Sequence, residues 1–204
     1  MFEDSEDTWP LPQYNPGARL HLHALGVIAI TYAAFERSID NLYEFHPARQ
    51  NAADDVANYL GLSIKKRIAS VRRAYALDEK SVRDAIDNVL VYFQQCNRNR
   101  NELLHAEQYP AMFGGEPETL YLIKRGDKRL PQSVYLKLKL TDLRAIADDM
   151  RRGVHQCAEI HIYIRFRGAP VADIPKNLRV YVDRGPPSPI PAPQPLYLSP
   201  KPQS

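Results

Sequence analysis

The residue types best suited to chemistry lie together in residues 98–105, which read Arg-Asn-Arg-Asn-Glu-Leu-Leu-His. His105 exchanges protons near neutral pH, and one such group accelerates a reaction by about a hundred- to ten-thousand-fold. Arg100 stays protonated, and its fork of N–H donors matches phosphate oxygens. Asn101 lies one helical turn before His105, where it orients the imidazole or binds a phosphate oxygen. These residues suit phosphodiester cleavage by internal attack of an RNA 2′-hydroxyl, without a metal ion.

The spacing of apolar residues predicts that Arg100 faces inward. Ile86, Phe93 and Arg100 are seven residues apart and so share one face of a helix. An inward arginine is costly unless it is paired or used. Glu36, one turn after Tyr32 on the first long helix, is a candidate partner for Arg100, with an ordinary boundary glutamate as the alternative.

Two other interpretations of the motif stay open. Arg98 also precedes an asparagine and lies seven residues before His105, so it shares a helix face with the histidine more closely than Arg100 does. We prefer Arg100 as the motif arginine and expect Arg98 to contact RNA phosphates. Alternatively the motif is a structural helix end, in which His105 caps the last carbonyls and Arg100 bridges to a carboxylate.

Arg100 to His105 resembles the Arg-Asn-x-x-x-His motif of the HEPN superfamily, named for higher eukaryote and prokaryote nucleotide-binding domains. The resemblance covers roughly residues 19–167 and implies a dimeric bundle of four or five helices. It also implies a metal-independent endoribonuclease that acts on single-stranded RNA, as a toxin or defence component with an antitoxin partner. Other members have lost catalysis, so the alternative is a non-catalytic dimerisation or interaction module of a bacterial or phage protein.

Carried over to this chain, the resemblance implies that Arg100, Asn101 and His105 are catalytic. Glu36 is then a supporting residue and Arg98 an RNA-binding residue. We expect neither a cofactor nor a metal ion, because the proposed chemistry needs none and no convincing carboxylate cluster accompanies the motif.

Helical periodicity dominates the chain and places the motif near the end of its fourth helix. Ser63 and Thr141 are candidate N-caps for the third and last helices, and His46-Pro47 ends the first. The predicted helices cover roughly residues 19–45, 51–60 and 63–75, a stretch from 78 or 81 into the motif, and a last one from 141 to beyond 161.

Residues 119–124 and 133–140 are strand-like, and in the second run apolar and polar residues alternate with period two. Gly126-Asp127 is expected to turn a β-hairpin between them. The expected fold is therefore mainly α: a bundle of four to five helices with one β-hairpin insertion at about 119–140. The expected domains are an extended arm over 1–18, the bundle over 19–167 and a Pro-rich tail over 168–204.

Composition indicates a cytoplasmic protein without a membrane segment. The net charge of +3 suits an anionic partner only weakly. The acidic start of the sequence lacks the features of a signal peptide, and no apolar run reaches membrane-spanning length. Cys96 and Cys157 fall in core-facing helical positions and are expected to be reduced packing residues.

The tail differs from the rest of the chain, because ten of the 17 prolines lie between residues 168 and 204. Proline removes backbone donors and fixes an extended φ, so we expect no packed element there and a tail outside the core. A tether or a strap over the domain is the simpler role, and a docking peptide for another protein is the alternative.

Overall fold

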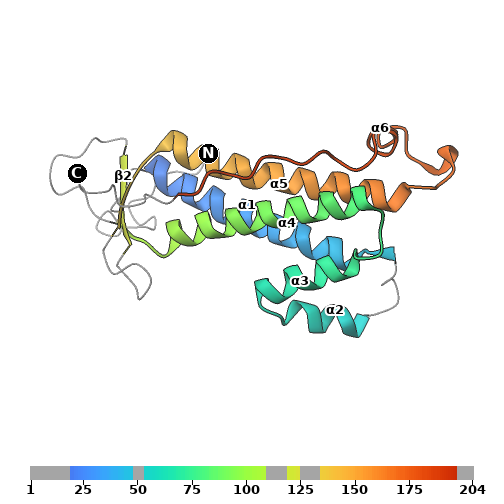
Figure 1. The fold of residues 1–204 in the computed structure, drawn as a ribbon. Helices are drawn as coiled ribbons and strands as arrows, with labels where there is room; N and C mark the ends of the chain where they lie inside the picture. The colour runs from blue at the N-terminus through green and yellow to red at the C-terminus, as the bar shows by residue number, and fades with distance from the viewer. Residues whose placement is uncertain (1–18, 48–52, 109–118, 125–133, 197–204) are drawn as a thin grey trace, which may run out of the picture.

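Three long helices lie side by side and form the body of the protein (Figure 1). The computed structural model describes residues 19–47, 53–108, 119–124 and 134–196, and the expected arm over 1–18 lies outside these ranges. The long helices are α1 (Arg19–Glu44), α4 (Lys80–Leu104) and α5 (Leu140–Phe166). A short helical pair, α2 (Ala53–Leu60) and α3 (Ile64–Ala74), packs at one end of the bundle, and a small sheet lies at the other. The prediction of a mainly helical protein is confirmed.

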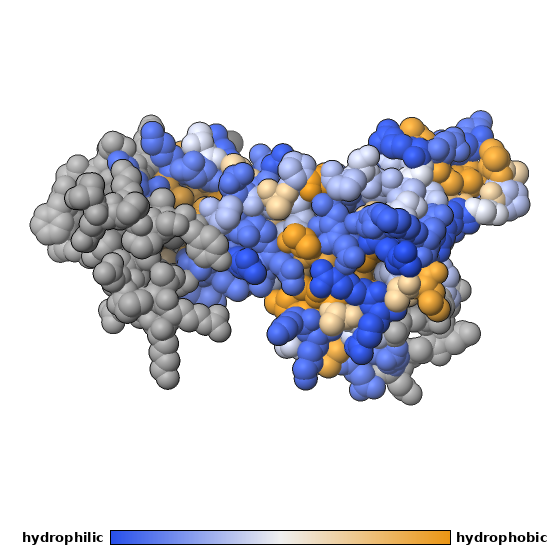
Figure 2. Space-filling view, in the orientation of Figure 1, coloured by the Kyte–Doolittle hydropathy of each residue, from blue (hydrophilic) through white to orange (hydrophobic). Residues whose placement is uncertain are grey.

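The core is built from apolar stripes that repeat at helical spacing. On α1 the stripe is fully buried at Ile28, Phe35 and Leu42, as a period of about 3.6 residues requires. Phe35 meets Phe93 of α4 edge-to-face, with ring centroids 5.1 Å apart. The remaining surface is mainly hydrophilic on the face seen in Figure 2, where apolar residues form separate patches. Within the described parts of the chain, no helix combines the length and apolarity needed to cross a bilayer.

Gly153 allows α1 and α5 to approach closely. It is buried in the middle of α5, and a Cβ atom added there would overlap the ring of Phe35. Glycine normally weakens a helix interior by about 1 kcal/mol relative to alanine. Its presence here is explained by this contact, because the ring of Phe35 occupies the space of the missing side chain.

Helix starts differ in detail from those expected. Ser63 does occupy the N-cap position of α3, but its side chain makes no capping hydrogen bond. α5 begins at Leu140, one residue before Thr141, and its N-cap is Lys139. The carboxylate of Asp142 accepts a hydrogen bond from the backbone N–H of Lys139 at 2.7 Å. The cap therefore comes from the acidic residue in the first turn, which also favours the positive end of the helix dipole.

The sheet has three antiparallel strands in the order β1-β2-β3: β1 (Glu107–Gln108), β2 (Thr119–Lys124) and β3 (Val134–Lys139). Leu122 pairs with Leu136 and Leu120 with Leu138 across β2 and β3. Leu122 and Leu138 are buried, so the sheet presents an apolar face to the bundle. The expected turn at 126–127 lies outside the described residues, and the short strand β1 was not predicted.

The segment after α5 is more ordered than its proline content suggested. It forms a 3-10 turn (Val171–Asp173), buries Ile174 and adds helix α6 (Arg179–Asp183). Residues 186–196, hereafter the strap, then run back along the bundle towards the sheet (Figure 1). Ile190 and Leu196 of the strap pack against the core. The expectation of a tail outside the core was wrong, because Ile190 and Leu196 stand among the prolines and still pack against the core.

Candidate functional site

The motif occupies the last two turns of α4, where the helix leads into the sheet. His105 is the C-cap residue, and its backbone N–H donates to the carbonyl of Asn101 at 3.0 Å. Leu103 is buried and anchors this end of the helix to the core. Arg98 and His105 are exposed, whereas Arg100 and Asn101 are half-buried. The motif therefore lies at a firmly packed helix end, where Arg98 and His105 are accessible and Arg100 is partly covered.

Arg100 lies on the face of an aromatic ring. Its guanidinium carbon is 5.2 Å from the ring centroid of Tyr32, within the range of a cation–π contact. Its Nη1 donates to Oδ1 of Asn101 at 3.0 Å, and its buried Nε has no hydrogen-bond partner. Among the described residues no carboxylate pairs with Arg100, so the alternative in which it bridges to a carboxylate finds no support there.

Glu36 does not pair with Arg100, which corrects the expected partnership. It forms an ion pair with Arg67 of α3 instead. The same guanidinium donates from Nη1 to both carboxylate oxygens of Asp40, at 3.0 Å each. Glu36 and Asp40 are one turn apart on α1, so they offer two carboxylates to one arginine fork. In the sequence, Arg67 follows Lys65 and Lys66 in a short basic run, which does not reveal this buried pairing.

Tyr32 is a site residue that the sequence did not single out. Its hydroxyl donates to Oδ1 of Asn97 at 2.7 Å. Burial, followed by the nearby charge of Glu36, raises the pKa of Tyr32 well above its usual value, although Arg100 and Arg67 oppose the shift. The phenol therefore stays neutral and serves as a flat platform for Arg100. The available signal was its place one turn before Glu36.

Asn101 links the two ionisable motif residues. Because Asn101 and His105 are four residues apart, they share a helix face. Nη1 of Arg100 donates to Oδ1 of Asn101, while the guanidinium itself lies over the ring of Tyr32. The side chain of His105 is exposed, and no side-chain hydrogen bond joins it to another described residue. The arrangement offers a fixed cation, an amide and an exposed imidazole in one short stretch.

Asn99 lies between Arg98 and Arg100 in the sequence, but it binds the strap. It is 2% exposed and faces the strap, where it donates from Nδ2 to the carbonyl of Gln194 at 2.9 Å. The motif therefore adjoins a second polar surface, which the sequence did not reveal.

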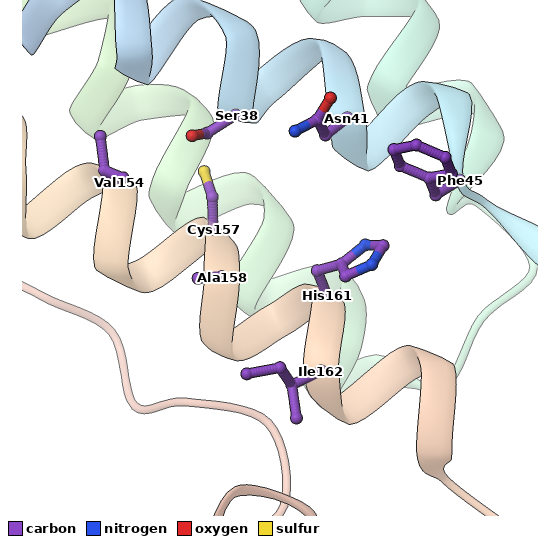
Figure 3. Close-up of a pocket in the computed structure, with 8 residues that line it drawn as sticks. All are labelled: Ser38, Asn41, Phe45, Val154, Cys157, Ala158, His161 and Ile162. Carbon is purple, nitrogen blue, oxygen red and sulfur yellow. The ribbon is translucent and has the colours of Figure 1, made fainter. Parts of the chain in front are cut away.

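A separate pocket lies between the ends of α1 and α5 (Figure 3). His161 lines it and meets the ring of Phe45 edge-to-face at 5.6 Å. Burial, and then the charge of Arg165, lower the pKa of His161. No carboxylate lines the pocket to orient this imidazole, and the described residues contain no group of three or more His, Cys, Asp or Glu side chains suited to a metal ion. The end of α4 is therefore the better candidate site.

Comparison of the chain with protein-family models, with curated proteins and with solved structures gives no match. The resemblance to HEPN proteins accordingly depends on residues 100–105 and on the helices that surround them.

Proposed function

We propose that this protein is a HEPN-like, metal-independent endoribonuclease that acts on single-stranded RNA in the cytoplasm. One observation carries the proposal: Arg100 is a half-buried cation that rests on a neutral ring and pairs with no described carboxylate. Keeping such a group uncompensated costs stability. Binding of an anion by Arg100 explains why that cost is tolerated.

In the proposed reaction, the exposed imidazole of His105 moves the proton between the 2′-hydroxyl and the leaving 5′-oxygen. Arg100 holds the non-bridging phosphate oxygens and stabilises the charge that grows on them. Asn101 accepts a hydrogen bond from Arg100, so its amide nitrogen is left to donate to the phosphate or to the imidazole. Arg98, exposed one turn earlier, binds a neighbouring phosphate of the RNA chain.

The site is proposed to work as a homodimer. On an ideal helix Arg100 and His105 point about 140° apart, so one motif covers a phosphodiester group incompletely. Two motifs related by a two-fold axis would place the histidine of one copy near the arginine of the other. A toxin or defence role, with an antitoxin protein as partner, belongs to the same proposal.

The test is cleavage of mixed single-stranded RNA by the purified protein, with and without EDTA. We expect cleavage in both conditions and products that carry a 2′,3′-cyclic phosphate or its hydrolysis product. His105→Ala should lower the rate by about a hundred-fold or more. The matched control is His155→Ala, which changes an exposed histidine on α5 and should leave the rate unaltered.

A second candidate function is a non-catalytic interaction module, and the packing of the strap against α4 and α5 favours it. The same assay distinguishes the two. Wild-type protein that binds RNA but never cuts it, with His105→Ala binding equally well, would remove the nuclease proposal and leave the module.

A further inference from the structure

The strap has a burial pattern with a period of three residues. Pro187 and Pro193 are buried, and Ile190 and Leu196 pack against the core. The pairs of residues between these four positions are all exposed. A polyproline II helix has three residues per turn, so one of its three edges contains every third residue. This burial pattern is the one expected where a single edge of a polyproline II helix meets α4 and α5.

Two asparagines of α4 hold the main chain of the strap. Asn88 donates from Nδ2 to the carbonyl of Ile190 and accepts from the backbone N–H of the same residue, at 3.0 Å each. Asn99 donates to the carbonyl of Gln194 at 2.9 Å and accepts from the N–H of Leu196 at 3.2 Å. Each asparagine amide thus donates one hydrogen bond to the main chain of the strap and accepts one from it. Main-chain groups make such bonds regardless of the side chains that the strap carries.

A third amide comes from α5, where Nε2 of Gln156 donates to the carbonyl of Ser188 at 3.0 Å. On α4, Nε2 of Gln95 donates to Oδ1 of Asn99 at 2.8 Å and fixes the orientation of that amide. Groove residues on both helices are thus arranged to receive the strap.

The spacing of the two asparagines matches that of the ligand. Asn88 and Asn99 are eleven residues apart, about 16.5 Å along an α-helix. The six residue-to-residue steps from Ile190 to Leu196 span about 19 Å in a polyproline II helix. Because every second strap residue from 187 to 195 is proline, backbone donors remain only at the positions between them. The two N–H groups that the asparagines bind belong to Ile190, which lies between two prolines, and to Leu196, which directly follows Pro195.

We propose that the groove between α4 and α5 is a binding site for a polyproline II peptide, and that the tail of a second copy of this chain takes the place of the strap. The groove binds the strap through the side-chain amides of Asn88, Asn99 and Gln156 and through apolar contacts at four strap positions. These contacts do not require a covalent connection between the groove and the peptide. The tail of another copy offers identical contacts, so exchange depends on concentration. Gly185, with φ +84°, begins the strap and is the hinge for exchange.

This site is separate from the nuclease chemistry and does not depend on it. The two adjoin at Asn99, which lies between Arg98 and Arg100. A tail that arrives from a second copy would therefore place its Gln194 and Leu196 against Asn99, beside Arg98 and Arg100 of the first.

The test uses the full chain with Ile190→Asp and Leu196→Asp, which releases the strap and leaves the groove intact. A fluorescent peptide with the sequence of residues 186–196 stands for the second copy's tail, and anisotropy measures its binding. We expect saturable binding, at least tenfold weaker binding to the wild-type chain whose own strap competes, and none for a peptide that carries the same two aspartates.

Asn88→Ala added to the strap-released chain should weaken peptide binding about tenfold, because two hydrogen bonds are lost. The matched control is Asn58→Ala, which alters an exposed asparagine on α2 and should have no effect. A folded, strap-released chain that fails to bind the peptide overturns the proposal. Equal binding of the aspartate peptide overturns it as well.

A second experiment tests the same proposal if the strap-released variant does not fold. A protease site inserted between Arg184 and Gly185 allows the folded wild-type chain to be cut, after which labelled peptide is added. Replacement of the cut fragment by the labelled peptide supports exchange. A fragment that never leaves on dilution, or leaves without being replaced, contradicts it.

Discussion

Two arginines rest on the same side of α1, and they are held in opposite ways. Tyr32, Glu36 and Asp40 follow one another at four-residue intervals along the helix. Arg100 of α4 lies on the first of them, and Arg67 of α3 pairs with the other two. Both guanidinium groups have a buried Nε without a hydrogen-bond partner. Burial alone therefore does not distinguish Arg67 from Arg100. The difference lies in the groups that face each guanidinium.

Arg67 is compensated in excess, whereas Arg100 is not compensated at all within the described residues. Two carboxylates face Arg67, and the side chains of Arg67 and Asp40 are 15% and 9% exposed. Burial raises the pKa of Asp40 even though hydrogen bonds from Tyr59 and Arg67 oppose the shift. This cluster holds α2 and α3 against α1. Arg100 meets a neutral phenol and an amide, so its charge remains available to a ligand.

The two alanine substitutions are expected to lower stability by unequal amounts. Arg67→Ala leaves Glu36 and Asp40 facing each other without a cation and should lower the free energy of unfolding by about 3 kcal/mol. Arg100→Ala loses one hydrogen bond and one cation–π contact and should cost about 1–2 kcal/mol. Urea denaturation of both variants measures the difference.

Equal costs for the two substitutions would break the comparison, because they would mean that Arg100 has a charged partner of its own. RNA cleavage supplies the second half of the test. It should be lost in Arg100→Ala and retained in Arg67→Ala at a temperature where both remain folded.

The helices could be predicted because burial alone determines their pattern. The stripe of Ile28, Phe35 and Leu42 repeats at helical spacing, and the structure buries all three. The partner of Glu36 could not be predicted in this way. Arg67 and Arg100 lie on different helices, and local periodicity does not tell which of those helices packs beside Glu36. The inward setting of Arg100 followed from its own helix, but the aromatic platform beneath it did not.

The strap shows a different limit. The residues that contact the bundle are every third one from Pro187 to Leu196, and this spacing is visible in the sequence. They were hidden by the stronger alternation of prolines and by the expectation that such a tail stays outside the core. In the sequence, Asn88 and Asn99 are indistinguishable from other polar residues of a helix. Only the structure shows that they bind the strap.

The cost of Arg67→Ala should depend on pH. Without Arg67, burial of Asp40 is opposed by Tyr59 alone, so the pKa of this carboxyl rises further in the folded state. The folded variant then holds a proton that the unfolded chain releases above about pH 4, and stability falls as pH increases through that window. Each unit of added shift is worth about 1.4 kcal/mol at neutral pH.

The measurement is the unfolding free energy of the wild type and of Arg67→Ala at a series of pH values from 4 to 7. The difference between them should widen with increasing pH, whereas the difference for Arg100→Ala should stay level. A difference that narrows towards neutral pH would show that Asp40 does not depend on Arg67.

The smallest effect is expected for Glu36→Gln. This variant tests directly whether Glu36 acts with Arg67 or with Arg100. Arg67 keeps both of its hydrogen bonds to Asp40 in this variant, and glutamine preserves the size of the side chain. Because Glu36 is 28% exposed, the loss of stability should be about 1 kcal/mol. RNA cleavage should not change, since Glu36 pairs with Arg67 and not with Arg100. A fall in cleavage together with unchanged stability would reverse the assignment, and Glu36 would then act with Arg100 at the end of α4.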